Sequence, residues 1–141
     1  MWNDGWDGYP AARTRLTDSL RKNEVANAVL LGGDVYENWG GHVKADYANA
    51  QSASIGVVFC GTSITSRSNN AARAKVAEWL GENPHFVFAD NKAKGYCVCE
   101  FTPTKLTTTL RVVDDVTRKD TKIEALATFN VQAGRAMVEP R

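Results

Sequence analysis

The sequence predicts an α+β domain in which a helix–strand unit precedes a mainly antiparallel meander of strands. Two observations support this class. In the first half, apolar residues recur at helical spacing and alternate with short apolar runs bounded by glycine. After residue 85 the pattern changes to alternation and apolar runs separated by short polar loops, which is typical of antiparallel strands. The 141 residues show no repeat or linker, so we expect a single domain over residues 1–141.

The first half begins with a helix and a buried strand. Proline suits the first turn of a helix, so we expect a helix from Pro10 to about Lys22, with Leu16 and Leu20 on its apolar face. The apolar run from Ala26 to Leu31 predicts a short buried strand that ends in the turn Gly32-Gly33-Asp34. Ligands in open α/β sheets bind at the carboxyl ends of strands, so this turn is a candidate binding position.

The next segment is predicted to hold a loop, a second buried strand and a second helix. A glycine-rich loop with aromatic residues runs from Tyr36 to Gly41, and a polar stretch leads to a buried strand from Ala53 to Cys60. A hydroxyl-rich loop over 61–70 precedes a helix from Ala71 to Leu80, which is expected to stop at the glycine that follows.

Four strands are expected after residue 85, and together they form the predicted meander. Their ranges are Phe86–Ala89, Gly95–Thr102, Leu106–Val113 and Ile123–Val131. The polar segment 114–121 between the last two is expected to be a solvated hairpin tip.

Charge and hydropathy argue against several classes of protein. The chain has 17 Lys and Arg residues against 16 Asp and Glu, and its basic residues are scattered, so we expect no nucleic-acid partner. The longest apolar run is far too short to cross a bilayer, so we expect no membrane partner. The start, Met1-Trp2-Asn3-Asp4, has neither a basic nor an apolar segment and predicts no secretory signal.

The three cysteines are predicted to be buried, unreactive thiols. Cys97 and Cys99 flank one residue of an expected strand, so their side chains point to the same face, which suits a mutual disulfide poorly. As a metal half-site, Cys-x-Cys lacks the second pair that makes a zinc signal strong. Free cysteine is usually a small core residue, and this interpretation is favoured.

The segment Gly-Gly-Asp-Val-Tyr-Glu-Asn-Trp, residues 32–39, is the most informative for chemistry. Its glycines permit a tight turn, and Asp34 and Asn38 offer hard oxygen donors on one short loop. Glu37 either supplies another carboxylate or faces water. The pattern indicates either a metal-binding loop or a common strand-to-loop turn.

Several segments also follow one another in an informative order. They are Trp6-Asp7-Gly8-Tyr9-Pro10 with Arg13 and Arg15, Leu31-Gly32-Gly33-Asp34-Val35 with Asn38-Trp39, Cys60-Gly61-Thr62-Ser63-Ile64-Thr65-Ser66, Asn83-Pro84-His85-Phe86 and Arg111-Val112-Val113-Asp114-Asp115-Val116. Together they resemble the C-terminal part of the PhoD-like alkaline phosphatases. The resemblance covers essentially the whole chain and implies the C-terminal half of a metallophosphoesterase α/β sandwich.

This resemblance implies a metal-dependent enzyme that hydrolyses phosphomonoesters and often phosphodiesters, with iron and calcium as cofactors, in a family that is secreted or periplasmic. It places Asp34 and Asn38 at metal-ligand positions. Tyr36 stands where the family motif has histidine, and tyrosinate is a possible ligand of iron(III). Arg13 is the candidate for binding the substrate phosphate, because a guanidinium matches phosphate bidentately, or it belongs to a solvated helix face.

Two functions stay open on the sequence alone. One is a metal-dependent phosphoester hydrolase, or a truncated form of one, which acts on a small-molecule phosphoester; most of the family's metal ligands are absent from this chain. The alternative is a non-catalytic fragment that serves as a binding or self-associating domain. Half of a sandwich exposes an apolar sheet face, so we also expect a homo-oligomer.

Overall fold

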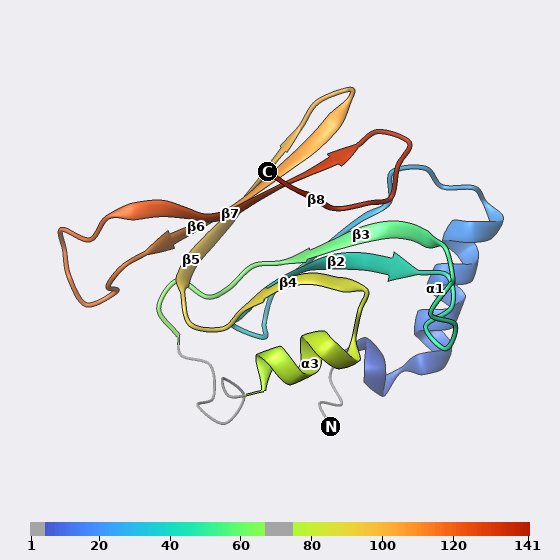
Figure 1. The fold of residues 1–141 in the computed structure, drawn as a ribbon, viewed down its shortest axis with the longest axis horizontal. Coiled ribbons are helices and arrows are strands. Elements are labelled where there is room, and N and C mark those ends of the chain that lie inside the picture. Colours follow the sequence, from blue (N-terminus) through green and yellow to red (C-terminus); the bar gives the residue numbers. More distant parts are fainter. Residues whose placement is uncertain (1–4, 67–74) are drawn as a thin grey trace.

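The computed structural model describes residues 5–66 and 75–141 and shows two β-sheets packed face to face (Figure 1). The first sheet contains, in spatial order, β1 (Val29–Gly32), β3 (Ser54–Cys60), β2 (Asn38–Lys44) and β4 (Phe86–Asp90). The second contains β5 (Lys94–Phe101), β6 (Lys105–Val113), β7 (Ile123–Gln132) and β8 (Glu139–Pro140). The described helices are η1 (Trp6–Gly8), α1 (Pro10–Lys22) and α3 (Val76–Glu82). The predicted α+β class is confirmed.

The strand directions bring three chain segments to one end of the first sheet. β1 runs parallel to β3, with Leu31 opposite Phe59, and β2 runs antiparallel to both β3 and β4. The carboxyl ends of β1 and β3 therefore lie beside the start of β2, where Trp39 is opposite Cys60. All pairs in the second sheet are antiparallel, as the meander predicted.

Aromatic side chains fill the space between the two sheets. The ring of Phe129 on β7 lies 5.9 Å from that of Phe59 on β3 and 5.4 Å from that of Phe88 on β4. Val57 and Leu110 complete this core and are fully buried. Each such side chain contributes about 1.5–3 kcal/mol by leaving water, so this cluster holds the sheets together.

The helices cover the outside of the first sheet. α3 lies over the face opposite the core (Figure 1), where the Trp79 ring is 6.4 Å from that of Trp39, which in turn is 4.9 Å from Phe86. α1 lies at the end of the sheet where β2 finishes (Figure 1). None of the helices in the described ranges is long and apolar enough to span a membrane.

One predicted loop is in fact a strand. The segment Tyr36–Gly41 was expected to be a loop, but residues from Asn38 onward form β2, a central strand of the first sheet. The sequence pattern does not reveal this strand, because the adjacent residues Gly40 and Gly41 break the apolar alternation. A Cβ on Gly41 would lie 2.7 Å from the carbonyl oxygen of His85, so glycine is what lets the chain after α3 approach this strand.

Other differences concern boundaries and pairing. The strand predicted at Phe86–Ala89 exists as β4 but pairs with β2 rather than joining the meander, and β8 was not predicted. β1 begins three residues later than predicted, after Asn27, whose φ of 61° is incompatible with an extended strand. Residues 71–74 of the predicted second helix lie outside the described residues; α3 continues through Gly81 to Glu82.

Candidate functional site

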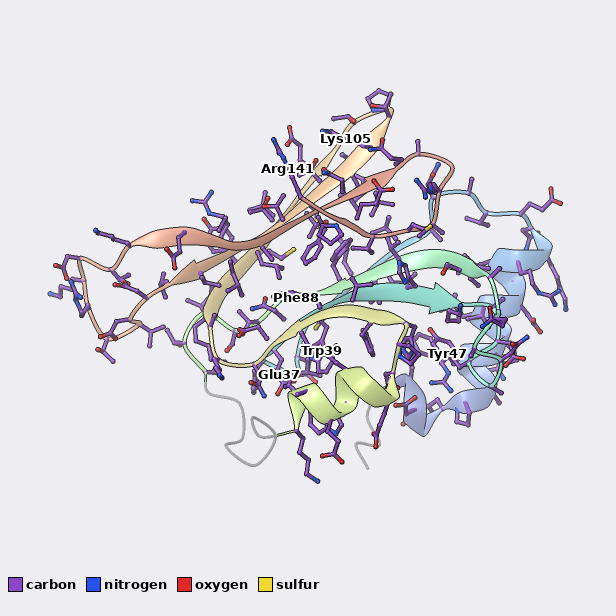
Figure 2. The ribbon with its side chains drawn as sticks, viewed as in Figure 1. Glu37, Trp39, Tyr47, Phe88, Lys105 and Arg141 are labelled. Atoms are coloured by element: carbon purple, nitrogen blue, oxygen red, sulfur yellow. The ribbon has the colours of Figure 1, made fainter. Side chains whose placement is uncertain are left out.

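The candidate metal loop joins β1 to β2 and comprises residues 33–37. It lies at the carboxyl end of β1, the position that the sequence indicated for a ligand. Figure 2 shows Glu37 and Trp39 at this end of the first sheet, whereas Tyr47, which follows β2, lies toward the other end, beside α1.

The loop backbone adopts a conformation that its side chains disfavour. Asp34 has a φ of 71° and Tyr36 a φ of 60°, both in the left-handed region that normally suits glycine. Each such residue costs about 1–3 kcal/mol unless its surroundings impose it. Two bonds hold the conformation of Tyr36: its carbonyl oxygen accepts hydrogen bonds from Thr62 Oγ1 at 2.9 Å and from Lys94 Nζ at 3.0 Å.

The three predicted metal ligands differ in exposure. The Asp34 side chain is exposed and Tyr36 is 44% exposed, whereas Asn38 is only 1% exposed. Asn38 Oδ1 accepts a hydrogen bond from the backbone N–H of Thr62 at 3.1 Å, which fixes the orientation of the amide. Its Nδ2 is buried and has no hydrogen-bond partner among the described residues. This atom is a donor, so it is not the atom of Asn38 that could ligate a metal.

The sequence left open whether Glu37 faces water, and the structure shows that it does not. It is 6% exposed, and its carboxylate accepts a hydrogen bond from the indole nitrogen of Trp39 at 3.0 Å. Trp39 also packs against α3, so this bond ties the end of the loop to the outer layer. The sequence pattern does not indicate this partner, because it predicts a loop where Trp39 lies in β2 and packs under α3.

The thiol beside the loop is held in its neutral form. Cys60 Sγ lies 3.6 Å from the carbonyl oxygen of Gly33. Burial, followed by the negative charges of Glu37 and Asp34, raises the pKa of Cys60 to about 11. The thiol therefore stays protonated near neutral pH and is no nucleophile there.

The other two cysteines share one strand face, as the sequence predicted, but are partly rather than fully buried. Cys97 and Cys99 point to the same face of β5, with their sulfur atoms 3.7 Å apart, and all three cysteines are free thiols. Burial, then the neighbouring Cys99, raises the pKa of Cys97 to about 12. Both side chains pack against the core between the sheets.

The donor set of the loop suits a hard cation but is incomplete. A carboxylate, a phenol and an amide oxygen are the ligand types that calcium and iron(III) prefer. Among the described residues, however, no three His, Cys, Asp or Glu side chains lie close enough together to hold a metal ion. Asp34, Tyr36 and Asn38 are therefore donors of a kind that suits a hard cation, but by themselves they do not form a complete metal site.

Arg13 lies apart from the other three candidates. It forms an ion pair with Asp7, and its guanidinium carbon lies 4.9 Å from the ring centre of Tyr47. The seven residues of β2 separate this position from the loop, a distance of about 20 Å at strand spacing. The sequence could not predict this separation, because it depends on which end of β2 meets α1.

Comparison with known proteins gives a consistent result. A family model described as "PhoD-like phosphatase" matches residues 1–110. The chain is 38% identical to alkaline phosphatase D of Bacillus subtilis (strain 168) over 130 residues, which are 92% of this chain and 22% of that protein. A solved structure described as "Structure of PhoD" superimposes with a TM-score of 0.87 and 34% identity, covering 97% of this chain and 26% of that one. The chain thus spans about a quarter of the length of these relatives.

Proposed function

Because this chain belongs to the PhoD-like phosphatase family, we propose that it is a metal-dependent phosphoester hydrolase, or a truncated form of one, whose β1–β2 loop supplies metal ligands. Asp34, Tyr36 and Asn38 are the proposed ligands, and calcium and iron are the proposed metals. The proposed substrate is a small-molecule phosphoester. The whole family architecture is longer than this chain, so the activity of the chain by itself is part of the proposal.

The observation that carries the proposal is the strained loop. Two non-glycine residues with positive φ values, Asp34 and Tyr36, flank Val35, and the carbonyl oxygen of Tyr36 accepts hydrogen bonds from Thr62 and Lys94. Strain of this kind persists where a fixed side-chain direction is useful, as at ligand sites. In an ordinary strand-to-loop turn these positive φ values would bring no advantage to Asp34 or Tyr36, because glycine adopts the same backbone without the strain.

The residues of the loop have separate roles in this proposal. A bound metal would polarise phosphoryl oxygens and activate a water molecule for attack. Asp34 brings a negative oxygen donor at an exposed position that substrate and water can reach. Asn38 brings a neutral oxygen whose direction is fixed by the Thr62 N–H. Glu37 stays bonded to Trp39 and holds the loop against the α3 layer.

Further ligands are proposed to come from a second polypeptide surface, and a second copy of the chain is the candidate. β5 is an edge strand that pairs with β6 alone among the described strands, and its outward-facing Tyr96 and Val98 are 41% and 44% exposed. An unpaired edge with exposed apolar side chains is a template for association. We therefore propose a homo-oligomer; a monomer by light scattering at micromolar concentration would count against it.

The test is turnover of a chromogenic phosphomonoester and a chromogenic phosphodiester by the 141-residue chain in metal-supplemented buffer. Asp34→Asn should abolish metal-dependent turnover, because it removes the anionic ligand and leaves the size of the side chain unchanged. The matched control is Asp120→Asn, which alters an exposed carboxylate paired with Arg118 on the β6–β7 hairpin and should leave turnover unchanged. Absent turnover in the wild type, or equal turnover in Asp34→Asn, contradicts the proposal.

A further inference from the structure

A second group of charged side chains lies at the end of the first sheet that is remote from the metal loop. It is drawn from η1, α1, the end of β2 and the turn before β4, which is the end marked by Tyr47 in Figure 2. We call it the cationic cluster, and its members are Asp7, Arg13, His42, Lys44, Tyr47 and His85.

Aromatic rings hold the cluster in place. The guanidinium of Arg13 lies over the ring of Tyr47, 4.9 Å from its centre, and the rings of Tyr47 and His85 are nearly perpendicular, with their centres 5.1 Å apart. His85 in turn packs on Phe86 at 4.5 Å. Stacking on a ring fixes the plane of a guanidinium and leaves its N–H edge available for an anion. Arg13 and His85 therefore both contact the same tyrosine ring.

Positive charge predominates at this position. The pKa of His85 is lowered first by burial and then by the charges of Lys44 and His42, with Arg13 acting in the same direction. Asp7 is the opposing carboxylate among the described residues that act on it. The pKa of His42 is likewise lowered by burial and by Lys44. Arg13 and Lys44 thus both act on His85 against one carboxylate, Asp7, and both imidazoles add charge when the pH falls.

Asp7 occupies the place that an external anion would take. Its carboxylate pairs with Arg13 just before the start of α1, where the positive end of the helix dipole also favours negative charge. The Asp7 side chain is 77% exposed. Exposed ion pairs contribute little to stability, so a ligand that meets several cations at once displaces this carboxylate readily.

We propose that Arg13, Lys44 and His85 form a binding site for a small oxyanion, of which phosphate and sulfate are examples, and that Asp7 is the internal anion the ligand displaces. This site is separate from the β1–β2 loop and does not depend on the metal proposal. It gives Arg13 a phosphate-binding role without requiring it to reach the loop about 20 Å away.

The experiment follows the His85 imidazole by NMR across a pH titration of the 141-residue chain, in chloride and in sulfate at equal ionic strength. A chelator is present throughout, so the metal loop cannot bind the anion. Sulfate does not titrate in this range, which leaves the protein as the source of any change. Bound sulfate should raise the pKa of His85, because an adjacent anion favours the imidazolium form. Equal pKa values in chloride and sulfate overturn the proposal.

Three substitutions test which residues form the oxyanion site. Arg13→Gln should weaken sulfate binding about tenfold, the cost of losing a charge-assisted hydrogen bond. Asp7→Asn should strengthen it several-fold, because the internal competitor is removed; this variant also tests the proposal if Arg13→Gln does not fold. Arg118→Gln on the distant hairpin is the matched control. If Arg118→Gln weakens sulfate binding as much as Arg13→Gln does, or if Asp7→Asn does not strengthen it, the proposed site is contradicted.

Discussion

The Nε2 atom of His42 accepts a hydrogen bond from the backbone N–H of Val138 at 3.1 Å, which joins β2 to the segment that leads into β8. His42 must be neutral at this nitrogen to accept. Burial and the charge of Lys44 lower the pKa of His42, in agreement with that requirement. The two sheets are thus linked by a bond that depends on pH.

Stability should therefore fall in acid. The pKa of His42 is lower in the folded chain than its ordinary value of about 6.5, so the unfolded chain binds more protons as the pH drops below that value. The free energy of unfolding, measured with urea, should be lower near pH 5 than near pH 7.5. His42→Gln should reduce this difference, because glutamine also offers an acceptor but does not titrate. An unchanged pH dependence in His42→Gln would show that other groups, such as His85, account for it.

A methyl group on Gly41 should destabilise the fold. The added Cβ would lie 2.7 Å from the His85 carbonyl oxygen and 2.9 Å from Phe86 Cα, and both are backbone atoms that cannot turn aside. Gly41→Ala should lower the free energy of unfolding by about 1–3 kcal/mol. Gly81→Ala is the control, because nothing lies within 4 Å of its Cβ and it sits inside α3. That variant should be neutral or more stable by up to about 1 kcal/mol. Equal effects of the two substitutions would refute the close approach.

The metal loop should loosen when its hydroxyl anchor is removed. Thr62→Val deletes the hydroxyl contacts to the carbonyl oxygens of Tyr36 and Ala93 and leaves the bond from Lys94 to Tyr36. We expect a loss of about 1 kcal/mol and faster amide hydrogen exchange over residues 33–37. Thr65→Val, at an exposed position in the same segment, should change neither quantity. Unaltered exchange in Thr62→Val would mean that the hydroxyl does not hold the loop.

The thiols should react slowly near neutral pH. Cys60 has a pKa raised to about 11 and Cys97 to about 12, so little thiolate is present. Alkylation by iodoacetamide, followed by mass spectrometry, should be much slower than for the amino acid cysteine in solution and should accelerate as the pH is raised. In Glu37→Gln, Cys60 should alkylate faster than in the wild type, because one of the charges that raise its pKa is gone. A rapid reaction of Cys60 at neutral pH in the wild type is the contrary outcome.

Parts of the fold follow from local pattern and parts do not. The α1 helix was predictable from Pro10 and its apolar spacing, and β3 from its continuous apolar run, because these signals are local. β2 was not, since Gly40 and Gly41 replace the large residues that mark a strand. Their small size is required by neighbours from β3 and from the turn after α3, which are remote in sequence.

The candidate site shows the same division. Asp34 and Asn38 are suggested by their position shortly after a predicted strand; Asp34 does lie in the loop after β1, whereas Asn38 is the first residue of β2 and contacts Thr62 after β3. Lys94 and Thr62, which hold the loop, are distant along the chain and carry no local signal. Arg13 was grouped with the loop by chemistry alone, whereas strand direction places it at the opposite end of the sheet.

The most direct test of the central proposal is the metal content of the purified chain after dialysis against calcium or iron, measured by elemental analysis. The proposal predicts metal retained by the wild type and by Asp120→Asn, and lost from Asp34→Asn. Equal metal content in Asp34→Asn and the wild type, or none in either, would contradict a metal-binding role for the β1–β2 loop.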